Sequence, residues 1–155
     1  MPVDITWVLG ILLTALLAAF FGSLIPRKLK EREKFIEAAA DFKNAFLPEL
    51  TFLKHNTIVP EIERPYTTLD EFLKSAYIHR HLKAYEVFRN YLSSKNRDGI
   101  DKAWKDYCCD PYNQSILYFE QYSWLVANKG KDYEKQLKEL ALSRIEKILG
   151  FAKHR

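Results

Sequence analysis

Two histidines, His79 and His81, stand two positions apart in a segment whose apolar spacing predicts a helix. Side chains that share a metal ion on one helix stand three or four positions apart, because only these lie on the same face. The sequence also has no HExxH motif and no zinc-type cysteine spacing. We therefore expect no metal ion and no cofactor. We interpret His81, which falls on the apolar stripe of its helix, as a hydrogen-bonded core residue.

Two pairs of carboxylates, Asp98 with Asp101 and Asp106 with Asp110, have the spacing that places side chains on one helical face. General acid–base catalysis needs one carboxyl group of such a pair to be buried, so that its pKa is raised. Asp98 is interpreted more simply as a helix N-cap, and Asp110 as a turn residue before Pro111. The sequence has no Gly-rich phosphate loop, nucleophile elbow or kinase motif. No catalytic residue follows from these motifs.

Cysteine usage is limited to the adjacent pair Cys108 and Cys109. Two cysteines are too few for a disulfide-stapled scaffold or for a four-cysteine zinc site. Neighbouring Cα atoms lie about 3.8 Å apart, which is below the usual disulfide range, so a mutual bond would be strained. We expect both thiols to be reduced.

The elements that position these groups begin with an uncharged stretch of 21 residues, from Ile5 to Ile25. A helix of this length spans about 30 Å, which matches the hydrocarbon core of a bilayer. The main alternative is a cleavable signal peptide. Against it, the residues before the stretch carry Asp4 and no cation, and the stretch exceeds the apolar region of such signals. Residues 1–26 are therefore predicted to be an N-terminal transmembrane anchor.

Small residues recur at four-residue intervals along the predicted span, at Gly10, Thr14, Ala18 and Gly22. Small residues let two helix backbones approach closely in lipid, where close packing replaces the hydrophobic effect as the driving force. We predict that this row packs against the span of a second copy or of another protein.

The net charge of +4 is concentrated next to the predicted span. Residues 27–34 form a basic juxtamembrane segment, whereas residues 35–155 carry 19 cations and 17 acids. Cationic flanks remain in the cytoplasm and contact anionic headgroups. We predict a single-pass protein of the inner membrane, with its N-terminus outside and its C-terminal body in the cytoplasm. Nucleic acid is not favoured as a partner, because the body lacks a basic patch. The cations of the juxtamembrane segment are Arg27, Lys28, Lys30, Arg32 and Lys34.

Residues 35–155 are predicted to form an all-α domain of about four helices. Apolar residues recur at helical spacing in the segments 27–46, 68–92, 100–107 and 131–149. Pro48 interrupts the first helix, Thr68 and Glu71 form a capping box for the second, and residues 93–99 are predicted to be a turn. The apolar stripes are Phe35, Ala39, Phe42 and Phe46; Leu69, Leu73, Tyr77, His81, Ala84, Phe88 and Leu92; Ile100, Trp104 and Tyr107; and Leu137, Ala141, Ile145 and Ile148.

The segment from Tyr112 to Val126 is rich in aromatic residues, and its pattern fits a strand by alternation and a short helix by composition. Aromatic residues with a polar tip are favoured both in small cores and at protein interfaces. The core is the preferred interpretation, with Tyr118 and Tyr122 expected to be exposed and to form a candidate partner surface.

Together these features favour a membrane-anchored interaction or assembly module that faces the cytoplasm, rather than an enzyme. Its expected partners are the lipid bilayer and a second copy or another transmembrane helix. The alternative is a small membrane-attached enzyme with a site near His81 and the segment Trp104–Asp110. A concave pocket lined by these side chains would favour the enzyme, and a flat aromatic face would favour the module.

Overall fold

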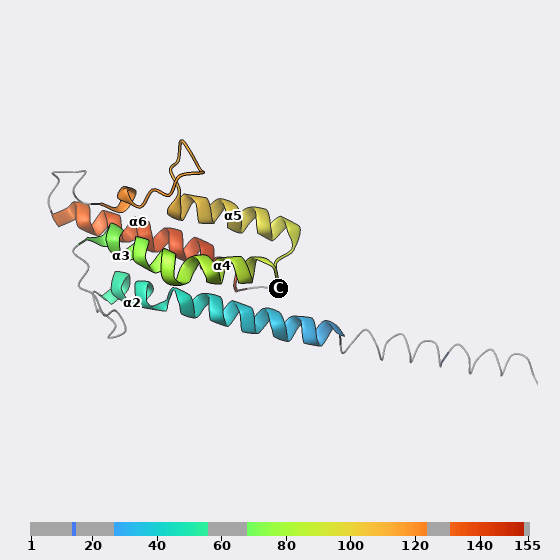
Figure 1. Cartoon of the computed structure of the whole chain (residues 1–155). Coiled ribbons are helices and arrows are strands. Elements are labelled where there is room, and N and C mark those ends of the chain that lie inside the picture. The colour runs from blue at the N-terminus through green and yellow to red at the C-terminus, as the bar shows by residue number, and fades with distance from the viewer. Residues whose placement is uncertain (1–13, 15–26, 56–67, 124–130, 154–155) are drawn as a thin grey trace, which may run out of the picture. The chain divides into compact units, whose positions relative to one another are not determined.

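The structure is a computed structural model that describes Thr14 and residues 27–55, 68–123 and 131–153. Within these residues the regular secondary structure is helical, as predicted, and strand pairing is limited to one antiparallel bridge between Cys109 and Leu117. Residues 27–45 are helical. They are followed by α2 (Leu47–His55), α3 (Leu69–Ala76), the π-helical turn η1 (Tyr77–His81), α4 (Leu82–Arg89), α5 (Ser94–Cys108), the 3-10 turn η2 (Glu120–Tyr122) and α6 (Lys131–Gly150) (Figure 1).

The chain divides into two compact units, residues 1–36 and residues 37–155. In the first unit, the five cations of the predicted juxtamembrane segment all lie on a helix and are solvent-exposed. The predicted span and its row of small residues lie outside the described residues, apart from Thr14, which is helical. Among the residues that the structure describes, no helix has the length and apolar character needed to cross a membrane.

The first helix of the second unit is interrupted where Pro48 predicts. Residues 37–45 and α2 are separated by a turn at Phe46, and the N–H of Leu50 then donates to the carbonyl of Phe46 at 3.0 Å. The helix is interrupted because proline lacks an N–H and because its ring collides with the carbonyl four residues earlier. The predicted stripe is confirmed, because all four of its members are buried: Phe35, Ala39, Phe42 and Phe46.

The predicted second helix is confirmed over α3, η1 and α4, with one irregularity. The side chain of Thr68 accepts a hydrogen bond from the N–H of Glu71, so the predicted cap is present. The π-helical turn lies in the middle, where the N–H of Leu82 donates to the carbonyl of Tyr77. Such turns insert one residue into an α-helix and are frequent at functional sites. The spacing of the apolar residues does not predict it.

Helix α5 is longer than predicted, which corrects two expectations. Residues 94–99 are helical rather than a turn, and the N-cap position belongs to Ser93 rather than to Asp98. The reason is the position of Gly99. A Cβ atom there would lie 2.8 Å from Cε1 of Phe151, so the missing side chain makes room for the aromatic ring that follows α6. Packing against Phe151 therefore overrides the helix-breaking tendency of glycine.

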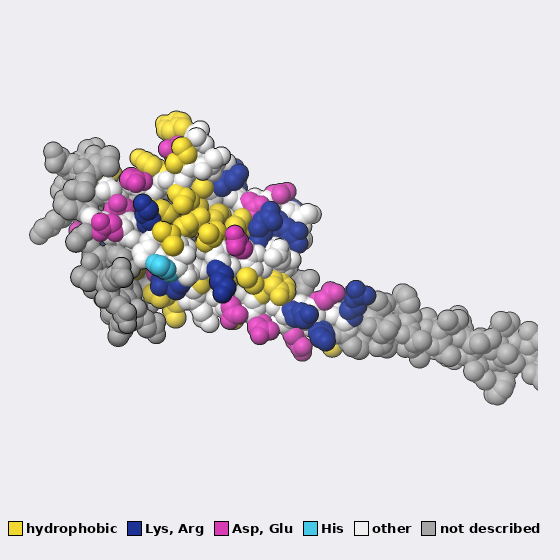
Figure 2. Space-filling model, viewed as in Figure 1, with side chains coloured by type: hydrophobic (Ala, Val, Ile, Leu, Met, Phe, Trp, Pro, Cys, Tyr) yellow, Lys and Arg dark blue, Asp and Glu magenta, His cyan; other side chains and the backbone are white. Residues whose placement is uncertain are grey.

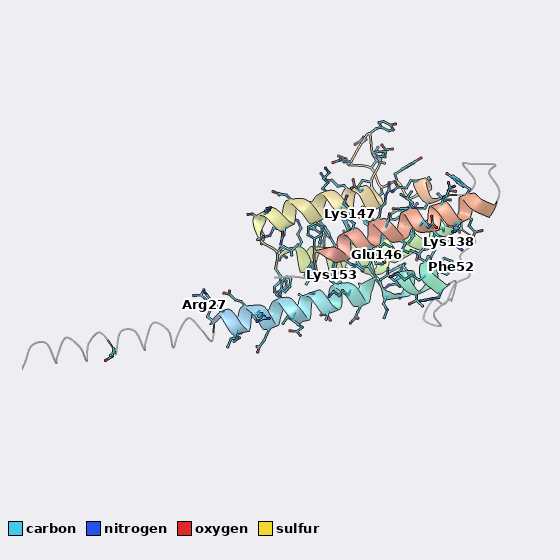
Figure 3. The ribbon with its side chains drawn as sticks, turned by 180° about the vertical axis from the view of Figure 1, so that it is seen from behind. Arg27, Phe52, Lys138, Glu146, Lys147 and Lys153 are labelled. Carbon is cyan, nitrogen blue, oxygen red and sulfur yellow. The ribbon has the colours of Figure 1, made fainter. Side chains whose placement is uncertain are left out.

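Helix α6 is confirmed from Lys131 to Gly150. The predicted ion pair between Glu134 and Lys138 is present, with an N–O distance of 2.8 Å. The buried face of α6 contacts α2 and α5. Figure 3 shows α6 from the side on which Lys138 lies over the ring of Phe52 in α2, 5.3 Å from its centroid. The predicted stripe is buried throughout: Leu137, Ala141, Ile145 and Ile148.

The segment predicted as either a strand or a short helix forms no strand over its described part, up to Ser123, and only its 3-10 turn η2 is helical. It forms an irregular loop followed by η2. Tyr122 has no exposed surface, so the expectation that it is exposed was wrong. Its hydroxyl donates to the carbonyl of Tyr107 at 2.8 Å and accepts from Arg144 at 3.2 Å. These two hydrogen bonds satisfy its polar tip inside the core, which explains the burial.

Candidate functional site

The two irregular points of the fold lie next to each other and hold a buried polar network. Glu49 follows the proline break, and His81 is the last residue of the π-helical turn. Both side chains are fully buried, together with Tyr107 on α5. Buried polar groups cost free energy unless hydrogen bonds satisfy them, so the stability of this network depends on its hydrogen bonds.

The hydrogen bonds of the network fix the roles of its members. Nε2 of His81 lies 2.9 Å from Oε2 of Glu49, and Nδ1 of His81 lies 3.0 Å from the hydroxyl of Tyr107. Arg80 forms an ion pair with the other oxygen of Glu49. A carboxylate only accepts, so Nε2 carries the proton and donates to Glu49, which leaves Nδ1 to accept from Tyr107. The chain of donors therefore runs from Tyr107 through His81 to Glu49.

The surroundings of His81 keep its imidazole uncharged. Burial lowers the pKa of His81, and the hydrogen bond that His81 donates to Glu49 only partly opposes that effect. The ring of Phe46 stacks on the imidazole with centroids 3.9 Å apart, which excludes water from one face. Burial also raises the pKa of Tyr107 well above its ordinary value. At neutral pH the imidazole is uncharged and the phenol keeps its proton.

The interpretation of His81 as a hydrogen-bonded core histidine is confirmed, but its partners were not identified from the sequence. Glu49 stands three residues after Phe46 and four before Leu53, so it continues the stripe of the first helix across the proline. A carboxylate on an apolar stripe is the signal that predicts a buried partner. His79 is exposed, whereas His81 is fully buried. No group of three or more potential metal ligands occurs among the described residues.

The carboxylates considered for acid–base chemistry do not form pairs with each other in the structure. Asp101 accepts from both Nε and Nη2 of Arg89, at 2.7 and 2.6 Å, and from the hydroxyl of Tyr85 at 2.6 Å. The Arg89 hydrogen bond lowers the pKa of Asp101, so this carboxyl group does not resemble a raised catalytic acid. Asp98 is exposed on α5.

The second carboxylate pair is also divided between different partners. Asp106 pairs with Lys147 of α6 at 2.8 Å. Asp110 accepts from the backbone N–H groups of Tyr112 and Asn113, at 2.7 and 2.9 Å. Asp110 therefore acts as a turn residue, as expected.

Asp110 also shapes a loop whose apolar side chains face solvent. The base of the loop is held by the N–H of Asp110 donating to the carbonyl of Ile116 at 3.0 Å, and by the N–H of Tyr118 donating to Cys108 at 2.9 Å. Tyr112 is 98% exposed, Ile116 53% and Leu117 46%. Tyr118 was predicted to be exposed, but its side chain is half-buried. The aromatic segment therefore divides into a buried part, which contains Phe119 and Tyr122, and a hydrogen-bonded loop at residues 110–117 that exposes three large hydrophobic side chains.

Comparison with protein-family models, with curated proteins and with solved structures finds no match to this chain.

Proposed function

We propose that this chain is a membrane-anchored interaction or assembly module, and that the loop at residues 110–117 is the surface that contacts its partner. The support is the combination of order and exposure in this loop. Its backbone is fixed by hydrogen bonds to Asp110, while Tyr112, Ile116 and Leu117 remain in solvent. Figure 2 shows hydrophobic side chains at the outer end of the loop that rises above α5 in Figure 1.

A rigid loop with apolar side chains has the energetic properties of an interaction surface. Burying a large apolar side chain contributes about 1.5–3 kcal/mol. Little of this is lost to ordering the loop on binding, because the backbone is already fixed. Tyrosine is also enriched among the residues that contribute most to protein interfaces. The buried network around His81 serves in this proposal to stabilise the helices that carry the loop.

The proposed anchor is the apolar stretch within residues 1–26, and the exposed cations of residues 27–34 support its orientation. Five cations on one exposed helical segment fit the cytoplasmic side of an inner membrane, where they would contact anionic headgroups. The proposed partner is a second copy of the chain. Two weak contacts, one through the spans and one through the loops, would reinforce each other by raising the effective concentration.

The experiment measures association between two differently tagged copies of the full chain in native membranes, by resonance energy transfer. The variant Tyr112→Ser/Ile116→Ser should lose association by at least about tenfold, since each side chain contributes on the order of 1 kcal/mol or more. Tyr91→Ser removes an exposed tyrosine elsewhere on the body and is the matched control. Unchanged association in the loop variant would overturn the proposal for this surface.

A second candidate function, a small membrane-attached enzyme, is favoured by one observation. The network of Tyr107, His81 and Glu49 has the order of a hydroxyl nucleophile, a base and an orienting carboxylate. Tyr107 belongs to the segment Trp104–Asp110, so its hydrogen bond to His81 connects the two parts of the site that the enzyme hypothesis names. The hydroxyl is buried, however, so a substrate would reach it only if the core opened. A sulfonyl fluoride that labels activated tyrosines tests this point: an enzyme should be labelled at Tyr107 in the folded protein, and a structural network should not.

A further inference from the structure

Two reduced thiols lie side by side where α5 ends. Both cysteines are free, and their Sγ atoms are 3.6 Å apart. Cys108 is the last residue of the helix, whereas Cys109 has the extended backbone angles φ −113° and ψ 158°. This change of backbone conformation brings the second thiol next to the first. The same backbone pairs Cys109 with Leu117, so the thiols lie at the base of the loop described above.

The distance between the sulfur atoms selects the kind of centre that they can bind together. With thiolate bonds of about 2.3 Å, a linear two-coordinate ion needs sulfur atoms about 4.6 Å apart. Sulfur atoms 3.6 Å apart instead enclose an angle of about 100° at the bound atom, for the same bond length of about 2.3 Å. This angle is that of a pyramidal or tetrahedral centre. Thiolate ligands also select soft, thiophilic elements over hard cations.

The surroundings of the two thiols distinguish a pyramidal from a tetrahedral centre. A tetrahedral structural ion takes four protein ligands and a catalytic one takes at least three, and among the described residues no group of three or more His, Cys, Asp or Glu is placed to supply them. A three-coordinate centre that brings its own third substituent needs only the two thiols. We propose that Cys108 and Cys109 form a dithiol site for a monosubstituted trivalent arsenical or a chemically similar pyramidal thiophile. This inference does not depend on the proposed function.

The reaction is a substitution with no change of oxidation state. An arsonous acid, R–As(OH)₂, forms one As–S bond to each thiol and breaks one As–O bond each time. Each thiol proton leaves with a hydroxide, so two water molecules are released. Cys109 is half-buried and reacts first, whereas Cys108 is 1% exposed and donates its S–H to the carbonyl of Trp104 at 3.2 Å.

The second step depends on the first. Burial raises the pKa of the Cys108 thiol, so this thiol reacts slowly with reagents from solution. Once arsenic is held by Cys109, attack of the neighbouring Cys108 sulfur on that arsenic is intramolecular and benefits from a high effective concentration. The closed ring fixes Cys109 and, through it, the backbone that pairs with Leu117.

The experiment uses the full chain in detergent micelles and phenylarsine oxide as the probe. Intact-mass spectrometry should show one phenylarsenic group per chain. This group should survive a wash with glutathione, a monothiol, at least about tenfold longer than an adduct held by a single cysteine, because two bonds must open together. A dithiol such as dithiothreitol should remove it.

The variants Cys108→Ser and Cys109→Ser are the matched tests, since each keeps one thiol of the pair. Either variant should lose the glutathione-resistant adduct while its circular dichroism spectrum is unchanged. Because Cys109 is half-buried, Cys109→Ser retains a folded protein even if Cys108→Ser does not. The Cys109→Ser variant by itself then tests whether the glutathione-resistant adduct needs both thiols. A wild-type protein that keeps no adduct after glutathione, or a Cys109→Ser variant that keeps it as long as wild type, would overturn the proposal.

Discussion

Nε2 of His81 donates to Oε2 of Glu49 over 2.9 Å, although the two residues are 32 positions apart in the sequence and neither has exposed surface. This hydrogen bond joins the proline break of the first helix to the π-helical turn of the second. The side chain beside each irregularity thus has its hydrogen-bond partner beside the other, and an imidazole that carries no charge connects them. The folding stability of the body therefore depends on the protonation of one side chain.

The first prediction concerns that dependence on pH. The pKa of His81 is lowered in the folded protein from the ordinary value of 6.5, so below this pH the unfolded chain binds a proton that the folded chain does not. The stability contributed by the neutral imidazole is present above pH 6.5 and is lost as the pH falls toward the folded pKa. Each pH unit within this window should cost about 1.4 kcal/mol. Urea unfolding followed by tryptophan fluorescence measures this loss.

Two substitutions separate His81 from the other groups that titrate. His81→Gln keeps a hydrogen-bonding side chain without a titrating ring, so its stability should change less with pH than that of the wild type between about pH 7.5 and pH 5.5. His79→Gln removes an exposed histidine from the same π-helical turn and should keep the wild-type pH dependence. An equal pH dependence in His81→Gln and wild type would show that the network does not carry the effect.

The second prediction concerns the phenol of the network. Tyr107→Phe removes the donor to Nδ1 of His81 and leaves a buried acceptor unsatisfied, at a cost of about 1–3 kcal/mol in the free energy of unfolding. Denaturant unfolding at neutral pH measures this cost. Tyr112→Phe is the control, because a phenol that is 98% exposed should lose almost nothing. A cost below about 0.5 kcal/mol for Tyr107→Phe would contradict a stabilising hydrogen bond between Tyr107 and His81.

The third prediction concerns topology, and it follows from the cations of residues 27–34. A cysteine is placed between Lys54 and Tyr66 in a Cys108→Ser/Cys109→Ser background. It should resist a membrane-impermeant thiol reagent in intact cells and react once the membrane is permeabilised, because the proposed orientation places the body in the cytoplasm. Full labelling of intact cells would reverse the proposed orientation.

The fourth prediction concerns the row of small residues in the proposed span. Replacing Gly10 and Gly22 by Ile should weaken association of the chain in native membranes, because branched side chains hold two helix backbones apart while the segment stays insertable. Leu13→Ile changes a position outside the row and should have little effect. Crosslinking between tagged copies measures the association. If the double variant crosslinks as well as the parent, the row reflects only the composition of the span.

Those elements of the fold that depend on local pattern could be predicted from the sequence. The stripe from Leu137 to Ile148 and the cap at Thr68 each depend on residues within a few turns of one another. Spacing and capping chemistry determine such features before any tertiary contact forms. The same is true of the interruption at Pro48, which follows from the covalent structure of proline.

Other features depend on contacts between distant residues, and local pattern does not contain them. The ring of Phe151 occupies the space that a side chain at Gly99 would need, and the buried hydroxyl of Tyr122 donates to the Tyr107 carbonyl. The candidate site is of this kind, since His81 could be assigned to the core but not to its partners. Glu49 was the one partner with a local signal, as a carboxylate on an otherwise apolar stripe.

The packing of α6 has a consequence for how the chain is made. Helix α2 contacts α6, and Lys54 pairs with Glu146 at 2.7 Å, so one of the earliest helices of the body is completed by the last. At ordinary rates of translation, about 4–15 s separate the synthesis of the two helices. Throughout this interval α2 lacks the cover that α6 later provides, which includes the side chain of Lys138 over the ring of Phe52. The body therefore acquires its native packing only after α6 has been synthesised, and a molecular chaperone that binds exposed apolar segments would have its substrate before that time.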